Sequence, residues 1–258
     1  MKTKIISKVL ISTMMLGTTI LPVTVLAEDG GVYNSNGVIE FEPSGDPTDP
    51  LDPTDPVNPV EPVDPTDPDG PNEGTNGPLS IDYASSLDFG IQKITSKDQT
   101  YFAAKQQYKV LDSEGNPTEE IQEGPNYVQV TDNRGTEMGW TLRVNQEGQF
   151  VSEKTGSVLN GAVISFNNGR VVTASESGKP VGQEKIVLNS DGAQSDVIAA
   201  SVGNGAGTYL FTWGDKDSAG ESIELSVPGA TTKYAEKYST KLIWTLTDTP
   251  GNQEDPGY

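Results

Sequence analysis

The sequence predicts an all-β protein, in which an antiparallel β-sandwich is preceded by a disordered, acidic, proline-rich stalk. Two patterns within residues 79–258 support the sandwich. Short runs of alternating apolar and polar residues recur between Gly, Asn, Asp and Pro, and no long window carries a helical stripe. A third pattern, a proline at every third position of residues 46–69, supports the stalk.

Residues 1–27 have the features of a signal peptide that is removed from the mature protein. Three lysines lie within the first eight residues, an apolar stretch runs from 9 to 26, and Val25-Leu26-Ala27 fits a small-residue cleavage site. The alternative is an uncleaved membrane anchor. Polar residues and Pro22 interrupt the apolar stretch, so we favour cleavage, after which no membrane span is expected.

Residues 28–78 are predicted to be a disordered lead and a linker built on an Asp-Pro repeat. Within residues 46–69, an acid or amide side chain followed by proline recurs every three residues. Proline fixes φ and favours extended geometry in the residue before it. As a polyproline II helix, at about 3.1 Å per residue, the repeat would reach roughly 75 Å. We expect a stiff stalk outside any core. The alternative, a ligand for a proline-reading groove, is less suited to a secreted chain.

Residues 79–258 are predicted to fold as one domain of many short strands. Asp132-Asn133-Arg134-Gly135 is interpreted as a hairpin turn in which Gly135 takes the left-handed conformation. The best helical candidate is Gln99–Tyr108. The predicted strands are Leu87–Ile94, Tyr101–Leu111, Tyr127–Thr131, Trp140–Asn145, Ser157–Phe166, Arg170–Ala174, Glu184–Leu188, Thr208–Trp213, Ser222–Val227 and Lys233–Thr247.

The composition argues against several classes of function. A formal net charge of −20 disfavours nucleic acid, which needs a basic face, and electrostatic docking on anionic lipid or wall polymers. The absence of His and Cys removes Cys-His catalysis, histidine zinc sites and disulfides. No pair of carboxylates stands out for acid–base chemistry, so we predict no enzyme, no cofactor and no metal. A calcium loop at Asp215, Asp217 and Glu221 is the alternative to a polar turn there.

The tripeptide Trp-Thr-Leu occurs twice, and it accounts for two of the three tryptophans of the chain. The first copy is Trp140-Thr141-Leu142, and the second is Trp244-Thr245-Leu246. Each copy lies in an alternating run, so its Trp and Leu share one face of a strand and its Thr lies on the other. The tryptophans are core residues or, alternatively, exposed rings that contact a ligand such as a sugar. The two strands could also lie side by side and brace a binding surface.

The sequence around both copies resembles the WxL domain family of Gram-positive cell-surface proteins. The resemblance is carried by Val130–Leu142, by Leu242–Pro250, and by the succession of signal peptide, acidic Asp-Pro linker and domain over 79–258. It implies non-covalent attachment to peptidoglycan through the two motifs. It also implies partners, namely a WxL-interacting protein and sortase-anchored proteins, and in some complexes host matrix proteins.

Residues 251–258 contain neither an apolar membrane stop nor a basic tail, and no Leu-Pro-x-Thr-Gly sorting motif precedes them. We therefore expect a secreted protein that is held on the wall without a covalent anchor. The alternative is a structural protein–protein module of a surface or adhesin complex, which reaches the wall only through its partners.

Overall fold

The computed structural model describes residues 32–250. The predictions made for residues 1–31 and 251–258, the signal peptide among them, lie outside the described residues. The chain divides into two units, residues 1–40 and 41–258. The described part of the first unit, residues 32–40, has no regular secondary structure. Every strand within residues 32–250 belongs to the second unit.

The described residues contain eighteen β-strands, and all their pairings are antiparallel. A single 3-10 turn, η1, spans Ala219–Glu221. The strands are β1 Leu51–Asp52, β2 Asp55–Pro62, β3 Leu79–Ala84, β4 Gln99–Phe102, β5 Gln106–Leu111, β6 Pro117–Gly124, β7 Tyr127–Asp132, β8 Trp140–Gln146, β9 Val151–Ser152, β10 Val163–Phe166, β11 Gly169–Val172, β12 Val181–Gly182, β13 Ile186–Val187, β14 Ser195–Ala200, β15 Gly207–Trp213, β16 Ile223–Val227, β17 Tyr238–Ser239 and β18 Leu242–Thr247.

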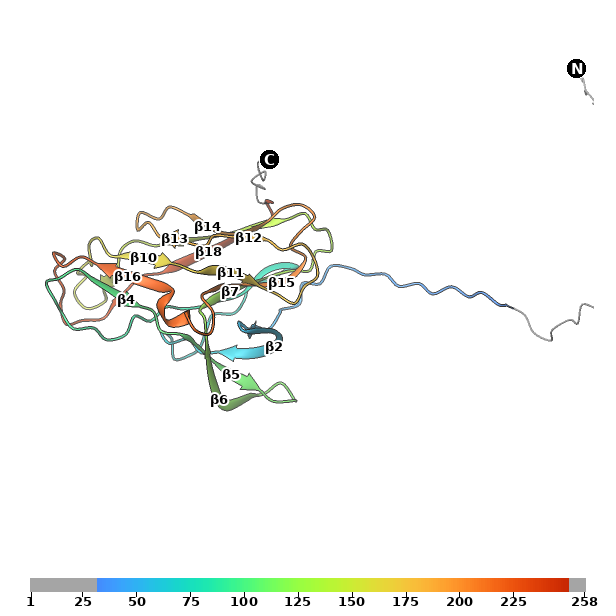
Figure 1. Ribbon diagram of the computed structural model, residues 1–258, viewed down its shortest axis with the longest axis horizontal. Helices are drawn as coiled ribbons and strands as arrows, with labels where there is room; N and C mark the ends of the chain where they lie inside the picture. The colour runs from blue at the N-terminus through green and yellow to red at the C-terminus, as the bar shows by residue number, and fades with distance from the viewer. Residues whose placement is uncertain (1–31, 251–258) are drawn as a thin grey trace, which may run out of the picture. The chain divides into compact units, whose positions relative to one another are not determined.

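Two four-stranded sheets pack face to face and form a β-sandwich (Figure 1). Their strand orders are β11-β15-β7-β3 and β12-β14-β8-β18. Aromatic rings meet between them, because the ring centroids of Trp140 on β8 and Tyr209 on β15 lie 6.2 Å apart. A third sheet, β13-β10-β16-β4, adds its apolar face to the same core. The all-β antiparallel fold predicted from the alternating pattern is therefore confirmed.

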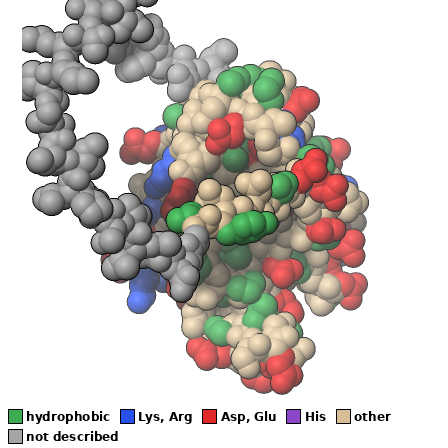
Figure 2. Space-filling model, turned by 90° about the vertical axis from the view of Figure 1, so that its right-hand side faces the viewer, with side chains coloured by type: hydrophobic (Ala, Val, Ile, Leu, Met, Phe, Trp, Pro, Cys, Tyr) green, Lys and Arg blue, Asp and Glu red, His purple; other side chains and the backbone are tan. Residues whose placement is uncertain are grey.

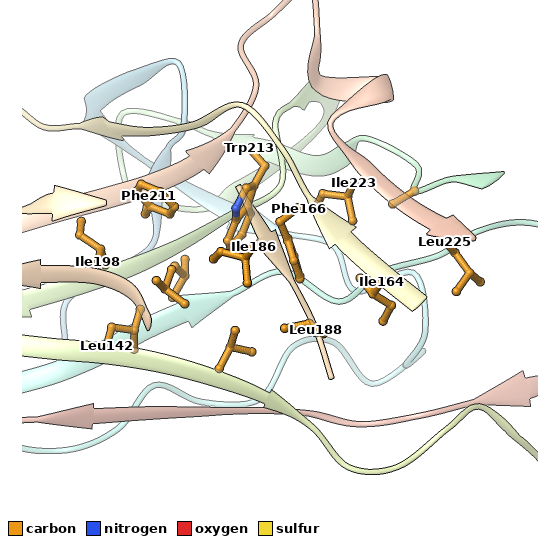
Figure 3. Close-up of a cluster of buried hydrophobic side chains, with 14 of the residues drawn as sticks. Leu142, Ile164, Phe166, Ile186, Leu188, Ile198, Phe211, Trp213, Ile223 and Leu225 are labelled. Carbon is orange, nitrogen blue, oxygen red and sulfur yellow. The ribbon is translucent and has the colours of Figure 1, made fainter. Parts of the chain in front are cut away.

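Trp213, at the end of β15, lies in the middle of this core (Figure 3). Its ring centroid is 4.6 Å from that of Phe166 on β10 and 5.7 Å from that of Phe211. Burial of large rings such as these supplies much of the hydrophobic driving force for folding. A core position for Trp213 is what its alternation with Phe211 predicts.

Several predicted elements differ from those in the structure. Leu87–Ile94 is a loop in which Ile91 is fully exposed, and Gln99–Tyr108 contains β4 and the start of β5 in place of a helix. Gly135 does have a positive φ of 68°. However, the turn at Asp132–Gly135 does not close a hairpin, because β7 and β8 lie in different sheets. It carries the chain from one layer of the sandwich to the other.

The expectation of a disordered stalk does not hold for residues 51–62. These residues form β1 and β2, which join β5 and β6 in a small sheet of order β1-β2-β5-β6 (Figure 1). Val60 lies opposite Val110 and is only 5% exposed. These strands belong to the same compact unit as residues 79–250, although the predicted boundary at residue 79 separates them.

Two physical reasons explain this correction. Proline already restricts the unfolded chain, so docking the repeat costs less conformational entropy than ordering an ordinary segment. The backbone of the repeat also finds distant partners, which no local pattern reveals. The Leu51 N–H donates to Gln129 Oε1 at 2.8 Å, and the Gln129 amide donates to the Asp49 carbonyl at 3.0 Å.

A buried carboxyl group, that of Asp82 on β3, holds the Gln129 side chain in place. Its oxygens accept hydrogen bonds from Gln129 Nε2 at 2.9 Å, from Ser80 Oγ at 2.6 Å and from Thr131 Oγ1 at 2.6 Å. Burial raises the pKa of Asp82 above its ordinary value, although these three hydrogen bonds oppose the shift.

This raised pKa predicts a pH dependence of stability. In the unfolded chain the pKa of Asp82 is about 3.9. Its contribution to stability is therefore fully present below that pH and is lost as pH rises through the higher folded-state pKa. We expect the stability of the wild type relative to Asp82→Asn, measured by urea unfolding from about pH 3 to 7, to fall as pH rises. A relative stability that rises with pH would contradict the assignment.

Candidate functional site

The two Trp-Thr-Leu motifs lie on neighbouring strands. β8 and β18 are antiparallel, with Leu246 opposite Leu142 and Trp244 opposite Val144. In the sheet order β12-β14-β8-β18, the second motif is on the edge strand and the first is one strand further in. The fold thus brings together two copies that are about a hundred residues apart in sequence.

The first motif is part of the core. Trp140 and Leu142 are both 0% exposed. The indole N–H of Trp140 donates to the Gly205 carbonyl at 2.9 Å, which satisfies the one polar group of the ring. The core interpretation therefore holds for Trp140, and this ring has no surface to offer a ligand.

The second motif is more accessible. Leu242, Trp244 and Leu246 face the same core, and the ring centroids of Trp244 and Trp213 are 5.8 Å apart. All three side chains are nevertheless only partly buried, because an edge strand has a neighbour on one side only. Of the two alternatives, contact with a ligand is therefore open to Trp244 but not to Trp140.

The outer face of the two strands is polar except at Ile243. Arg143 on β8 forms an ion pair with Asp196 on β14, with 2.6 Å between Nε and Oδ1. Thr245 lies opposite Arg143, and the neighbouring Ile243 is 42% exposed. Thr141 is buried, because the chain that follows β18 crosses it and the Thr249 carbonyl accepts a hydrogen bond from its hydroxyl at 2.8 Å.

Arg134 stabilises the turn that leads into the first motif. Its guanidinium group donates two hydrogen bonds to the Asp132 carboxylate, at 2.9 and 2.8 Å, and a third to the Gly139 carbonyl at 2.8 Å. Hydrogen bonding to Asp132 raises the pKa of Arg134. Arg134 and Arg143 are both engaged in ion pairs.

The sequence does not single out two residues that build this site. Gly205 accepts the Trp140 hydrogen bond, and it has a positive φ of 85°. Thr249 covers the hydroxyl of the first motif. The cluster of glycines around residue 205 is a signal of special backbone geometry, but nothing local links it to a tryptophan 65 positions away.

The polar turn expected at residues 215–221 is present. The Asp215 carboxylate accepts hydrogen bonds from the hydroxyl and backbone N–H of Ser218 and from the N–H of Asp217, and these bonds lower its pKa. Among residues 32–250, no group of three or more acidic side chains is placed to hold a metal ion. The part of the chain described by the structure also has no helix long and apolar enough to cross a membrane.

Acidic side chains are scattered over the face of the molecule drawn in Figure 2.

In the comparison with known families, residues 28–250 match the family described as "WxL domain surface cell wall-binding". The match spans both motifs and also includes the Asp-Pro repeat. No curated protein and no solved structure matches the chain.

Proposed function

We propose a function from the premise that the chain belongs to the WxL domain family of surface cell wall-binding domains. In this proposal, the protein is secreted and attached non-covalently to Gram-positive peptidoglycan through this domain. The family has a binding role rather than a catalytic one. The observation that carries the proposal is the arrangement of the motifs. The buried first motif supports an edge strand on which the second motif is still accessible.

We place the wall contact on β18. This strand pairs with β8 alone among the described residues, so its other edge presents free backbone N–H and C=O groups. Trp244 adds a partly exposed aromatic ring, which is suited to stacking on a sugar. Such contacts act at short range. Binding to an anionic wall must rely on short-range contacts, because the net charge of −20 makes the electrostatic force between the chain and the wall repulsive.

The proposal predicts that Trp244→Ala weakens binding to purified peptidoglycan, freed of protein and teichoic acid, by about tenfold, or roughly 1.4 kcal/mol. The measurement is a sedimentation pull-down with residues 28–258. The control is Ile91→Ala, which removes a fully exposed apolar side chain from a loop outside this sheet. Equal retention of both folded variants would place the wall contact elsewhere.

The exposed edge also favours a second candidate function. A free strand edge is a common docking site for a strand of another protein. In that case the domain is a structural module that binds a WxL-interacting protein or sortase-anchored proteins, and through them the wall or host matrix proteins. The same pull-down separates the two functions. Binding that appears only after a cell-surface protein fraction is added would support the module and oppose direct attachment.

A further inference from the structure

The Asp-Pro segment, defined here as residues 49–64, lies against a contact surface that contains the buried side chains of Gln129, Gln106 and Tyr108 and is termed the groove. Gln129, which is 0% exposed, both accepts from the Leu51 N–H and donates to the Asp49 carbonyl. An amide that contacts a backbone N–H and C=O in this way recognises an extended chain whatever its side chains are. Its own orientation is fixed by the buried Asp82.

A second buried glutamine binds the other end of the segment. Gln106, which is 2% exposed, donates to the Val63 carbonyl at 2.8 Å, and the Tyr83 hydroxyl holds the amide from behind at 2.6 Å. The Val63 N–H donates to the Gln107 carbonyl at 2.8 Å. The groove therefore forms hydrogen bonds to the backbone at both ends of the segment.

Between these ends, the groove contacts the acid and the proline of one repeat. The Tyr108 hydroxyl donates to Asp52 Oδ1 at 3.0 Å. Gly124 leaves room for Pro53, since a Cβ atom at position 124 would lie 3.0 Å from Pro53 Cγ. Val60 fills the apolar part of the contact. These features make up a site for an extended, acidic, proline-containing chain.

The connection between the segment and the rest of the domain makes an exchange possible. Residues 65–73 are mostly exposed, and their hydrogen bonds reach no further than Asp64. Nine residues of extended chain span about 30 Å. Every contact that the segment makes in its own groove is therefore available in the groove of a second copy.

We propose that the groove is also an intermolecular site, in which the Asp-Pro segment of a second copy of this chain docks in place of the chain's own segment. Both states contain the same contacts, so protein concentration decides between them. A short flexible connection gives the chain's own segment an effective concentration on the order of 1 mM. The exchanged dimer should accordingly form where the local concentration approaches this value.

Two variants of residues 28–258 separate the two partners of the contact. Gly124→Val blocks a groove but leaves its segment intact. Val60→Asp disables a segment but leaves its groove intact. Sedimentation equilibrium, at concentrations up to about 1 mM, should show that each variant alone is a monomer. The equimolar mixture should form heterodimers, because it contains one working groove and one working segment per pair. The control is the double variant Val60→Asp/Gly124→Val on its own. It should be monomeric, because it has neither a working groove nor a working segment.

A folded pair of variants that stays monomeric in the mixture would overturn the proposal. If Gly124→Val does not fold, the same question is put to Val60→Asp with a synthetic peptide of residues 49–64. Saturable binding of one peptide per chain, weakened at least tenfold by Gln129→Leu, is the expected result. Binding that Gln129→Leu leaves unchanged, or no binding up to about 1 mM, would show that the groove does not accept a segment from another chain.

Discussion

Replacing Trp140 by alanine should lower the free energy of unfolding by about 3–5 kcal/mol, the usual cost of truncating a fully buried large aromatic side chain. Trp140 is 0% exposed, packs against Tyr209 and donates its indole hydrogen to Gly205. The variant loses all of these contacts and leaves a cavity between the two layers of the sandwich. Urea unfolding followed by tyrosine fluorescence or circular dichroism measures the loss.

Trp244→Ala is the matched comparison, since it changes the same residue type in the other copy of the motif. Its ring is only partly buried, so we expect a smaller loss of roughly 1–3 kcal/mol. Trp140→Phe, which keeps a ring but removes the hydrogen bond to Gly205, should fall between wild type and Trp140→Ala. Equal losses for Trp140→Ala and Trp244→Ala would show that the two rings are equivalent, against the burial seen in the structure.

This difference between the motifs marks a limit of what alternation can predict. The pattern around each copy correctly predicts which side chains face the core, because side chains in a strand alternate between its two faces. The pattern does not reveal that β18 is an edge strand. Edge position depends on which strands pair, and the pairing of β18 with β8 joins residues about a hundred positions apart.

Residues 51–62 were the larger difference between sequence and structure. A repeat rich in proline and acid indicates disorder because it contains too few apolar side chains to bury. Here the decisive contacts come from polar residues, Gln106 and Gln129, whose amides bind the backbone of the repeat. Glutamine in an alternating strand gives no local sign that it is buried or that it binds a distant segment.

Two further elements show the same dependence on neighbours. β6 is a strand because β5 offers it an edge, although its sequence carries only one large apolar residue, Ile121, which is 55% exposed. In Leu87–Ile94, by contrast, two apolar side chains contact the core but the backbone forms no strand. Leu87 and Phe89 pack against the core as their alternation predicts, but the backbone there pairs with no other strand among the described residues. Alternation in the sequence indicates which side chains are buried. Whether the segment forms a strand also depends on a neighbouring strand that can hydrogen-bond to its backbone.

The second large effect is expected at Gly205, whose carbonyl accepts the hydrogen bond from Trp140. Gly205→Ala should destabilise the protein by about 2–5 kcal/mol, from the left-handed backbone and from overpacking together. Gly205 has a φ of 85°, and a Cβ atom there would lie 2.7 Å from the indole nitrogen of Trp140 and would also overlap Ala200. Neither group can move freely, because both are buried in the core.

Gly203→Ala isolates the contribution of the clash. Gly203 has nearly the same φ, 84°, but a Cβ atom there would meet nothing within 4 Å. We therefore expect Gly203→Ala to lose only about 1–2 kcal/mol, the cost of the left-handed conformation alone. The excess loss in Gly205→Ala, measured by urea unfolding of both variants, then reports how rigidly the first motif is held. If that excess is absent, the Trp140 ring can yield to an added methyl group, and the buried first motif is not the rigid support that the partly buried second motif requires.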